Sequence, residues 1–124
     1  MSGAGAGRFN LGFPIHWWHG KSGRVYPHSV FPLGDVPWVP EANYVLSAFG
    51  PNGTYEPIYI GATEDLGETL RTNSVVPHAL RLGATHIHIH LLGESPQRRL
   101  EIRQDLRDAC RMALSPEQAL LAAS

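Results

Sequence analysis

The sequence contains a single cysteine, Cys110, so no intramolecular disulfide can form. It also lacks a run of about 18 apolar residues, the length that a membrane-spanning helix requires. The first ten residues, MSGAGAGRFN, contain no apolar signal core, and position 2 is a serine where N-myristoylation would require glycine. These absences predict a cytoplasmic protein that does not contact a membrane.

Charge is also scarce, at 17% of residues. Eleven acids against ten bases give a net charge of −1, which argues against a protein that binds nucleic acid through an overall basic surface. Nine of the ten bases are arginines, whose planar guanidinium suits phosphate or carboxylate recognition. Residues 1–70 hold three bases and six acids, whereas residues 71–124 hold seven arginines and five acids, so we expect any anion site in the second half.

The length of 124 residues and the apolar content of 43% predict one domain with a single hydrophobic core. Turn signals and periodicity predict the following elements in chain order: extended segments around a turn in 13–31, a hairpin at 43–61, a helix at 64–72, a helical turn at 77–82, a strand at 84–92, a long helix from 95 to 114 and a short helix at 119–123. This order is typical of an α+β fold.

The long helix is predicted to begin at Ser95, a side chain that can cap the first turn. One face carries an apolar stripe, which consists of Ile102, Leu106, Ala109, Cys110 and Ala113. Beside it runs a basic ridge with a four-residue spacing, formed by Arg99, Arg103, Arg107 and Arg111. The ridge is either a solvated face paired with acids of the same helix or a strip that contacts phosphates.

Two tyrosines lie in the predicted hairpin. Tyr44 follows Asn43, and Tyr59 begins a Tyr-Ile-Gly sequence that is followed by Thr63-Glu64-Asp65-Leu66. Over about residues 42–114 this pattern resembles the GIY-YIG nuclease family. The resemblance implies a small three-stranded antiparallel sheet flanked by helices in a domain spanning 42–124. The composition and turn signals of residues 1–41 predict a flexible arm and an aromatic β-hairpin extension.

Members of that family cleave phosphodiesters with one divalent metal ion, Mg²⁺ or Mn²⁺. The resemblance implies that Tyr44 and Tyr59 orient or deprotonate the attacking water. The position of the family's phosphate-binding arginine is occupied by Thr69, and that of its His or Tyr partner by Asn73, while Arg71 lies about 160° around the helix from the arginine position.

A family glutamate on the later helix holds the metal. If Asp105 and Leu106 match the residues that follow it, its position is taken by Arg103, and Glu101 is the nearest acid. The active site that the resemblance implies is therefore degenerate.

The strand at 84–92 carries His86, His88 and His90 on one face because side chains alternate with period two. The pattern resembles the histidine-triad nucleotide hydrolases, in which the middle histidine attacks the α-phosphate. Three imidazoles on one face also suit a metal site. The third interpretation is a solvated or interface-facing strand face, with Ile87, Ile89 and Leu91 in the core.

The three tryptophans are expected to anchor the core or an interface. An exposed Trp17–Trp18 pair would indicate a protein partner or self-association, whereas Trp38 lies in a proline-rich connector.

The leading hypothesis is a non-catalytic module that binds DNA, RNA or another phosphate without a cofactor. Its expected binding residues are Arg71, Arg99, Arg103, Arg107, Arg111, His86, His88 and His90. The alternatives are a metal-dependent nuclease that uses Tyr44, Tyr59 and Glu101, a nucleotide hydrolase that uses His88, and a scaffold that dimerises through its tryptophans.

Overall fold

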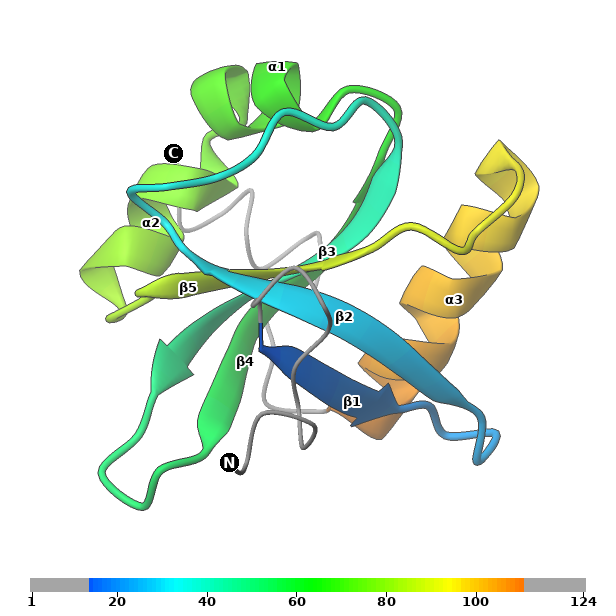
Figure 1. Cartoon of the computed structure of the whole chain (residues 1–124), viewed down its shortest axis with the longest axis horizontal. Coiled ribbons are helices and arrows are strands. Elements are labelled where there is room, and N and C mark those ends of the chain that lie inside the picture. The colour runs from blue at the N-terminus through cyan, green and yellow to red at the C-terminus, as the bar shows by residue number, and fades with distance from the viewer. Residues whose placement is uncertain (1–13, 111–124) are drawn as a thin grey trace, which may run out of the picture.

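A computed structural model describes residues 14–110 and shows an α+β fold, as the order of elements predicts (Figure 1). The elements in chain order are β1 (Ile15–His19), β2 (Val25–Pro32), β3 (Ala42–Phe49), β4 (Tyr55–Thr63), α1 (Leu66–Thr72), α2 (Val75–Arg81), β5 (His86–His90) and α3 (Pro96–Ala109). The predicted arm at 1–8, the helix at 119–123, Ala113 and Arg111 fall outside the described residues.

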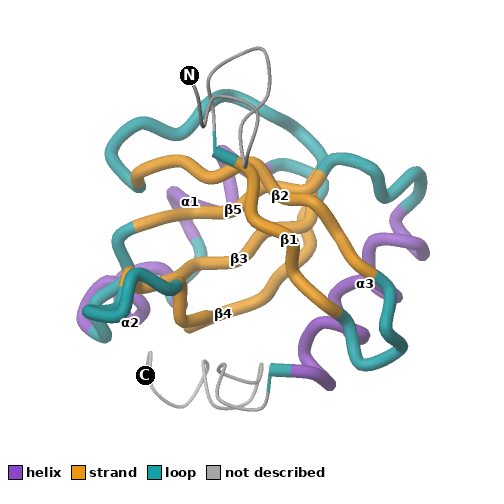
Figure 2. The backbone as a smooth tube through the Cα atoms, turned by 60° about the horizontal axis from the view of Figure 1, so that its bottom comes forward, coloured by secondary structure: helices purple, strands orange, loops and turns teal. Residues whose placement is uncertain are grey.

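The five strands form one antiparallel sheet in the order β1-β2-β5-β3-β4, so the expected three-stranded sheet is wrong (Figure 2). Three of the strands, β3, β4 and β5, are those that the patterns predicted. The other two form the aromatic hairpin, which joins the sheet because β2 pairs with β5 over Ser29–Ile89 and Val30–His88. This long-range pairing has no local sequence signal, so the sequence patterns alone predict the hairpin as an extension of the domain.

Helices cover both faces of the sheet, with α1 and α2 on one face and α3 on the other (Figure 1). The larger core lies on the α1/α2 face and contains, among others, Phe31, Tyr44, Leu46, Leu66, Ala79, Ile87 and Ile89. The smaller core lies under α3 and consists of Trp18, Tyr26, Val45, Ile60, Ile102 and Leu106. Of the predicted stripe, Ile102 and Leu106 are buried, Cys110 is half-buried and Ala109 is exposed.

Side-chain caps fix where two of the helices begin. The Ser95 hydroxyl accepts a hydrogen bond from the backbone N–H of Arg98 at 3.0 Å, as predicted for α3. Helix α1 begins later than predicted because Asp65 caps it, accepting from the N–H of Glu68 at 3.1 Å, whereas Thr63 accepts from the N–H of Asp65. Within residues 14–110, no helix has the length and apolarity needed to cross a membrane.

Candidate functional site

The two hairpin tyrosines lie close together, with ring centroids 6.1 Å apart. Tyr44 is buried, and its ring lies directly over Gly61, its cross-strand neighbour: a Cβ at that glycine would come within 2.5 Å of the Tyr44 ring. Burial raises the pKa of Tyr44 above its ordinary value, and the neighbouring Tyr59 raises it further. Tyr44 is therefore protonated at neutral pH and cannot act as a general base in this conformation.

Two arginines of α3 approach these tyrosines at the β4 edge of the sheet. Arg107 donates from Nε to the backbone oxygen of Ile60 at 2.9 Å, and its guanidinium carbon lies 5.3 Å from the centre of the Tyr59 ring. The positive charges of Arg103 and Arg107 both act on Tyr44 and favour its ionised form. We name Tyr44, Tyr59, Arg103 and Arg107 the tyrosine–arginine site.

Part of the hydrogen-bonding capacity of these arginines is unused. Nε of Arg103 and Nη2 of Arg107 are buried without a hydrogen-bond partner, and none of the ion pairs formed by residues 14–110 includes either side chain. Burial lowers the pKa of Arg107, and the adjacent Arg103 charge lowers it too, while Tyr59 opposes the shift. A guanidinium remains charged despite such a shift, so the site carries positive charge without a neutralising carboxylate among the described residues.

The remaining residues named by the nuclease resemblance have other structural roles. Glu101 is exposed and pairs with Arg98 at 3.2 Å. The Thr69 hydroxyl shares a 2.6 Å hydrogen bond with Thr63. Asn73 ends α1, and its side-chain oxygen accepts from the N–H of Val75 at 2.8 Å.

The basic ridge of α3 does not form a continuous ligand-facing strip. Arg99 is buried, donating to the backbone oxygen of Gly93 at 2.9 Å and lying 3.9 Å from a carboxylate oxygen of Glu41. Arg71, on α1, pairs with Glu68. Arg99 is therefore engaged within the protein, and Arg103 and Arg107 are the ridge residues that the structure brings to the tyrosines.

The middle histidine of β5 is fully buried, not solvated as the third interpretation expected. His88 Nδ1 accepts a hydrogen bond from the indole N–H of Trp18 at 3.0 Å, which requires the ring proton on Nε2, where it is donated to the Ser47 hydroxyl at 2.8 Å. Burial lowers the pKa of His88 to about 2. Both ring nitrogens are thus occupied, and His88 has no free lone pair for phosphate attack or a metal.

The other strand histidines differ from one another. His86 is half-buried and shares a 2.8 Å hydrogen bond with the Thr85 hydroxyl, whereas His90 is buried and donates from Nδ1 to the Pro27 carbonyl at 2.7 Å. The alternate residues Ile87 and Ile89 are buried as expected, but Leu91 is exposed. Across the part of the chain that the structure describes, no group of three or more His, Cys, Asp or Glu side chains is arranged to hold a metal ion.

The three tryptophans also differ in burial. Trp18 is buried beside His88, while Trp17 on the opposite face is 53% exposed and Trp38 is 80% exposed. An exposed Trp17–Trp18 pair is therefore not present, because adjacent residues of a strand point to opposite faces.

Sequence analysis missed that His16 and His28 share the sheet face of His88. Both histidines act electrostatically on His88, and the ring centroid of His16 lies 5.4 Å from that of His88. The signal was the period-two alternation of Tyr26, His28 and Val30 in β2, which places all three on the face that α3 covers.

Comparisons of this chain with models of protein families, with curated proteins and with solved structures find no match in any of the three.

Proposed function

We propose that this protein binds the phosphate groups of nucleic acid without cleaving them, through the tyrosine–arginine site. The observation that carries the proposal is the pair of guanidiniums on successive turns of α3, beside two phenols, with unpartnered N–H groups and no ion pair within residues 14–110. Both side chains are half-buried and have no carboxylate partner among residues 14–110, so a phosphate would neutralise positive charge that the protein leaves unpaired. Arginine also recognises phosphate with two parallel hydrogen bonds.

The order of elements supports the resemblance to the GIY-YIG nucleases. Strand β3 lies between β4 and β5, and the chain runs through β3, β4, α1, α2, β5 and α3. The side chains argue for binding over cleavage on this scaffold. If Asp105 and Leu106 match the residues that follow the family's metal-binding glutamate, Arg103 takes the position of that glutamate. A guanidinium there would repel a cation but attract the phosphate itself. Glu101 contacts Arg98 instead of the tyrosines.

The test is fluorescence anisotropy of short DNA and RNA duplexes titrated with the full chain at about 50 and 200 mM salt. We expect Arg103→Gln and Arg107→Gln each to weaken duplex binding several-fold. Each should also reduce the steepness of the plot of log binding constant against log salt concentration by about one. Arg81→Gln is the matched control, because Arg81 is exposed on α2 and loses the same charge.

Absence of binding at about 50 mM salt, or equal losses in the control and the two site variants, would refute the proposal. A second arm incubates plasmid with Mg²⁺ or Mn²⁺ and compares the protein with Tyr59→Phe. Cleavage that Tyr59→Phe abolishes would establish the nuclease instead.

A further inference from the structure

A groove of about 320 Å³ lies on the flank of α3 away from the tyrosine–arginine site, between the first turns of α3, the start of β2 and the end of β5. Its lining residues are Arg24, Val25, Tyr26, Pro27, His90, Leu92, Arg98 and Ile102. Neither Arg103 nor Arg107 lines it, so this groove is separate from the tyrosine–arginine site. It combines one hydrogen-bond acceptor, two cations and apolar walls.

The acceptor is Nε2 of His90. A carbonyl oxygen can only accept, so the contact with Pro27 fixes the ring proton on Nδ1 and leaves a lone pair on Nε2. No described residue bonds to that nitrogen, and it is not among the fully buried unpartnered atoms, although the residue is only 3% exposed. Burial lowers the pKa of His90, as does the nearby Arg98 charge, while the Pro27 hydrogen bond opposes the shift. At neutral pH, the groove therefore offers an imidazole acceptor.

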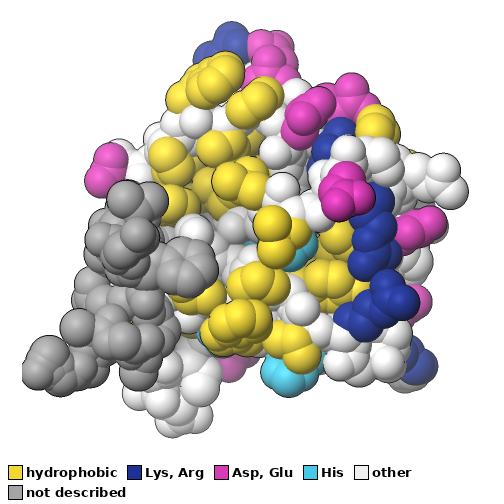
Figure 3. All heavy atoms as spheres, turned by 45° about the vertical axis from the view of Figure 1, so that its right-hand side comes forward, with side chains coloured by type: hydrophobic (Ala, Val, Ile, Leu, Met, Phe, Trp, Pro, Cys, Tyr) yellow, Lys and Arg dark blue, Asp and Glu magenta, His cyan; other side chains and the backbone are white. Residues whose placement is uncertain are grey.

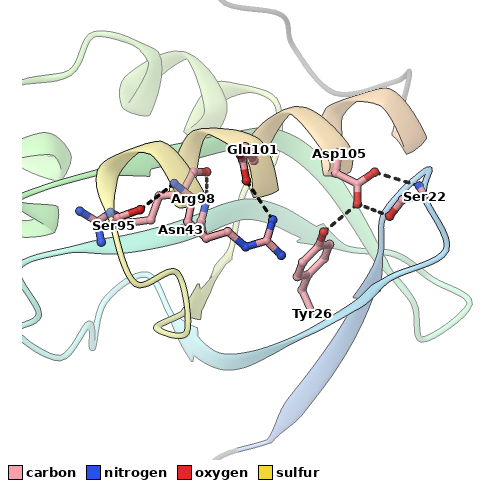
Figure 4. A network of polar contacts seen from close by, with 8 residues as sticks. Ser22, Tyr26, Asn43, Ser95, Arg98, Glu101 and Asp105 are labelled. Carbon is pink, nitrogen blue, oxygen red and sulfur yellow. Dashed lines mark hydrogen bonds and ion pairs between the residues drawn. The ribbon is translucent and has the colours of Figure 1, made fainter.

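The cations are Arg24 and Arg98. Figure 4 shows the Arg98 side chain extended toward the Tyr26 ring, with its guanidinium bonded to Glu101 at 3.2 Å. The nearby acids Glu101 and Asp105 do not line the groove. Glu101 pairs with Arg98 at the surface, and Asp105 accepts hydrogen bonds from Ser22 and Tyr26. The charged groups that a ligand meets in the groove are both positive.

The walls are apolar and partly uncovered. Leu92 is 66% exposed and Val25 is 41% exposed, while Ile102 is buried beneath them. Figure 3 shows Lys and Arg side chains, with Asp and Glu side chains among them, beside exposed apolar side chains on this side of the molecule. The volume lies near the lower end of the range of about 300–1,000 Å³ for ligand pockets, which favours a single-ring ligand.

We propose that this groove binds a small aromatic carboxylate that carries a ring hydroxyl or ring N–H. The carboxylate pairs with Arg98, the ring lies against Leu92 and Pro27, and the ring donor bonds to Nε2 of His90. This inference does not depend on the phosphate-binding proposal, since the two sites use different side chains.

The experiment is isothermal titration calorimetry of the full chain at pH 7.5 with four probes. These are 4-hydroxybenzoate, benzoate, which lacks the donor, phenol, which lacks the charge, and adenosine 5′-monophosphate. We expect 4-hydroxybenzoate to bind at least five-fold more tightly than benzoate and ten-fold more tightly than phenol, because a neutral hydrogen bond is worth about 1 kcal/mol and a charged one more.

Two variants locate the binding. Arg98→Met should weaken the binding of 4-hydroxybenzoate at least ten-fold. Leu92→Ser should weaken this binding several-fold without unfolding the protein, since Leu92 is mostly exposed. The matched controls are Arg81→Met and Leu82→Ser, exposed residues at the end of α2 that do not line the groove.

No heat of binding for 4-hydroxybenzoate at millimolar concentration would overturn the proposal, as would equal affinity for all three aromatic probes. Unchanged affinity in Arg98→Met would also overturn it. Binding of the nucleotide alone would assign the groove to nucleotides instead. Duplex binding by the Arg98→Met protein reports separately on the tyrosine–arginine site, so failure of one proposal is distinguishable from failure of the other.

Discussion

At the scale of single residues, the tyrosine-and-glycine pattern of the hairpin has a packing explanation. Tyr44 and Gly61 are directly opposite in the β3–β4 pair, and the aromatic ring occupies the space where a side chain at position 61 would stand. An aromatic side chain lying over a glycine shields the backbone and stabilises the pair. The motif that suggests a nuclease thus contributes to folding whether or not the protein binds phosphate.

We expect Gly61→Ala to lower the free energy of unfolding by about 1–3 kcal/mol, since overpacking a filled site costs this much. The new Cβ would lie 2.5 Å from the Tyr44 ring, which is itself buried and has little room to move. Urea denaturation followed by circular dichroism measures the change.

Gly34→Ala is the control, because a Cβ at Gly34 meets nothing within 4 Å. The same Gly61→Ala substitution should lower the free energy of unfolding by a smaller amount in a Tyr44→Ala background, because the tyrosine ring is absent there. An equal cost in both backgrounds would show that the tyrosine does not constrain position 61.

At the scale of elements, local patterns predicted the strands at β3, β4 and β5 and the start of α3, since alternation, turn residues and the Ser95 cap act within a few residues. They did not predict how distant elements meet. Trp18 of β1 packs against His88 and helps to bury it, and Arg99 is buried where it donates to the Gly93 carbonyl.

For the candidate site, the sequence identified both tyrosines and the arginines of α3, but not which arginines reach them. Arg103 and Arg107 lie on the flank of α3 that faces the β4 edge, whereas Arg98 lies on the β2–β5 flank. That distinction depends on how the helix is rotated against the sheet, which the four-residue spacing leaves open.

The turn between β1 and β2 is held against α3 by one carboxylate. Asp105 accepts hydrogen bonds from the N–H and hydroxyl of Ser22 and from the hydroxyl of Tyr26, at 2.6–2.9 Å (Figure 4). Burial raises the pKa of Asp105, but these hydrogen bonds and the Arg24 charge outweigh it, so the pKa is lowered overall. Gly20 leaves space for the carboxylate, because a Cβ there would lie 2.0 Å from it.

We expect Asp105→Asn to lower the free energy of unfolding by about 1–3 kcal/mol, because hydrogen bonds to a charged acceptor are stronger than those to an amide. Hydrogen exchange should show faster exchange of the Ser22 amide, which donates to this carboxylate. Asp108→Asn is the control, since Asp108 is exposed and its side chain accepts a hydrogen bond from Gln104 of the same helix. Unchanged exchange at Ser22 would mean that Asp105 does not hold the turn.

At the scale of the whole molecule, the sheet face under α3 contains a group of histidines that the fold keeps neutral. Burial lowers the pKa of His28 to about 3 and that of His88 to about 2, and it also lowers the pKa values of His16 and His90. Three strands contribute these rings, so the group exists only when the aromatic hairpin and β5 are paired. Protonation of the group therefore opposes the fold as a unit.

The stability of the protein should consequently fall as the pH is lowered below about 6.5, the histidine pKa in the unfolded chain. Because the folded pKa values are depressed, the unfolded state binds more protons in this window, and the stabilisation is complete only above pH 6.5. His28 and His88 should each lower the free energy of unfolding by about 2 kcal/mol as the pH falls from 6.5 to 5. Urea denaturation at several pH values measures this slope.

His28→Asn separates titration from packing, because an asparagine amide can still donate to the Tyr26 carbonyl that His28 Nδ1 now contacts at 2.9 Å. The variant should show a slope smaller by about 1.2 kcal/mol per pH unit between pH 6 and 5. If His28→Asn retained the full slope, His28 would not be held neutral in the folded state, and the pH dependence would have to arise from other groups.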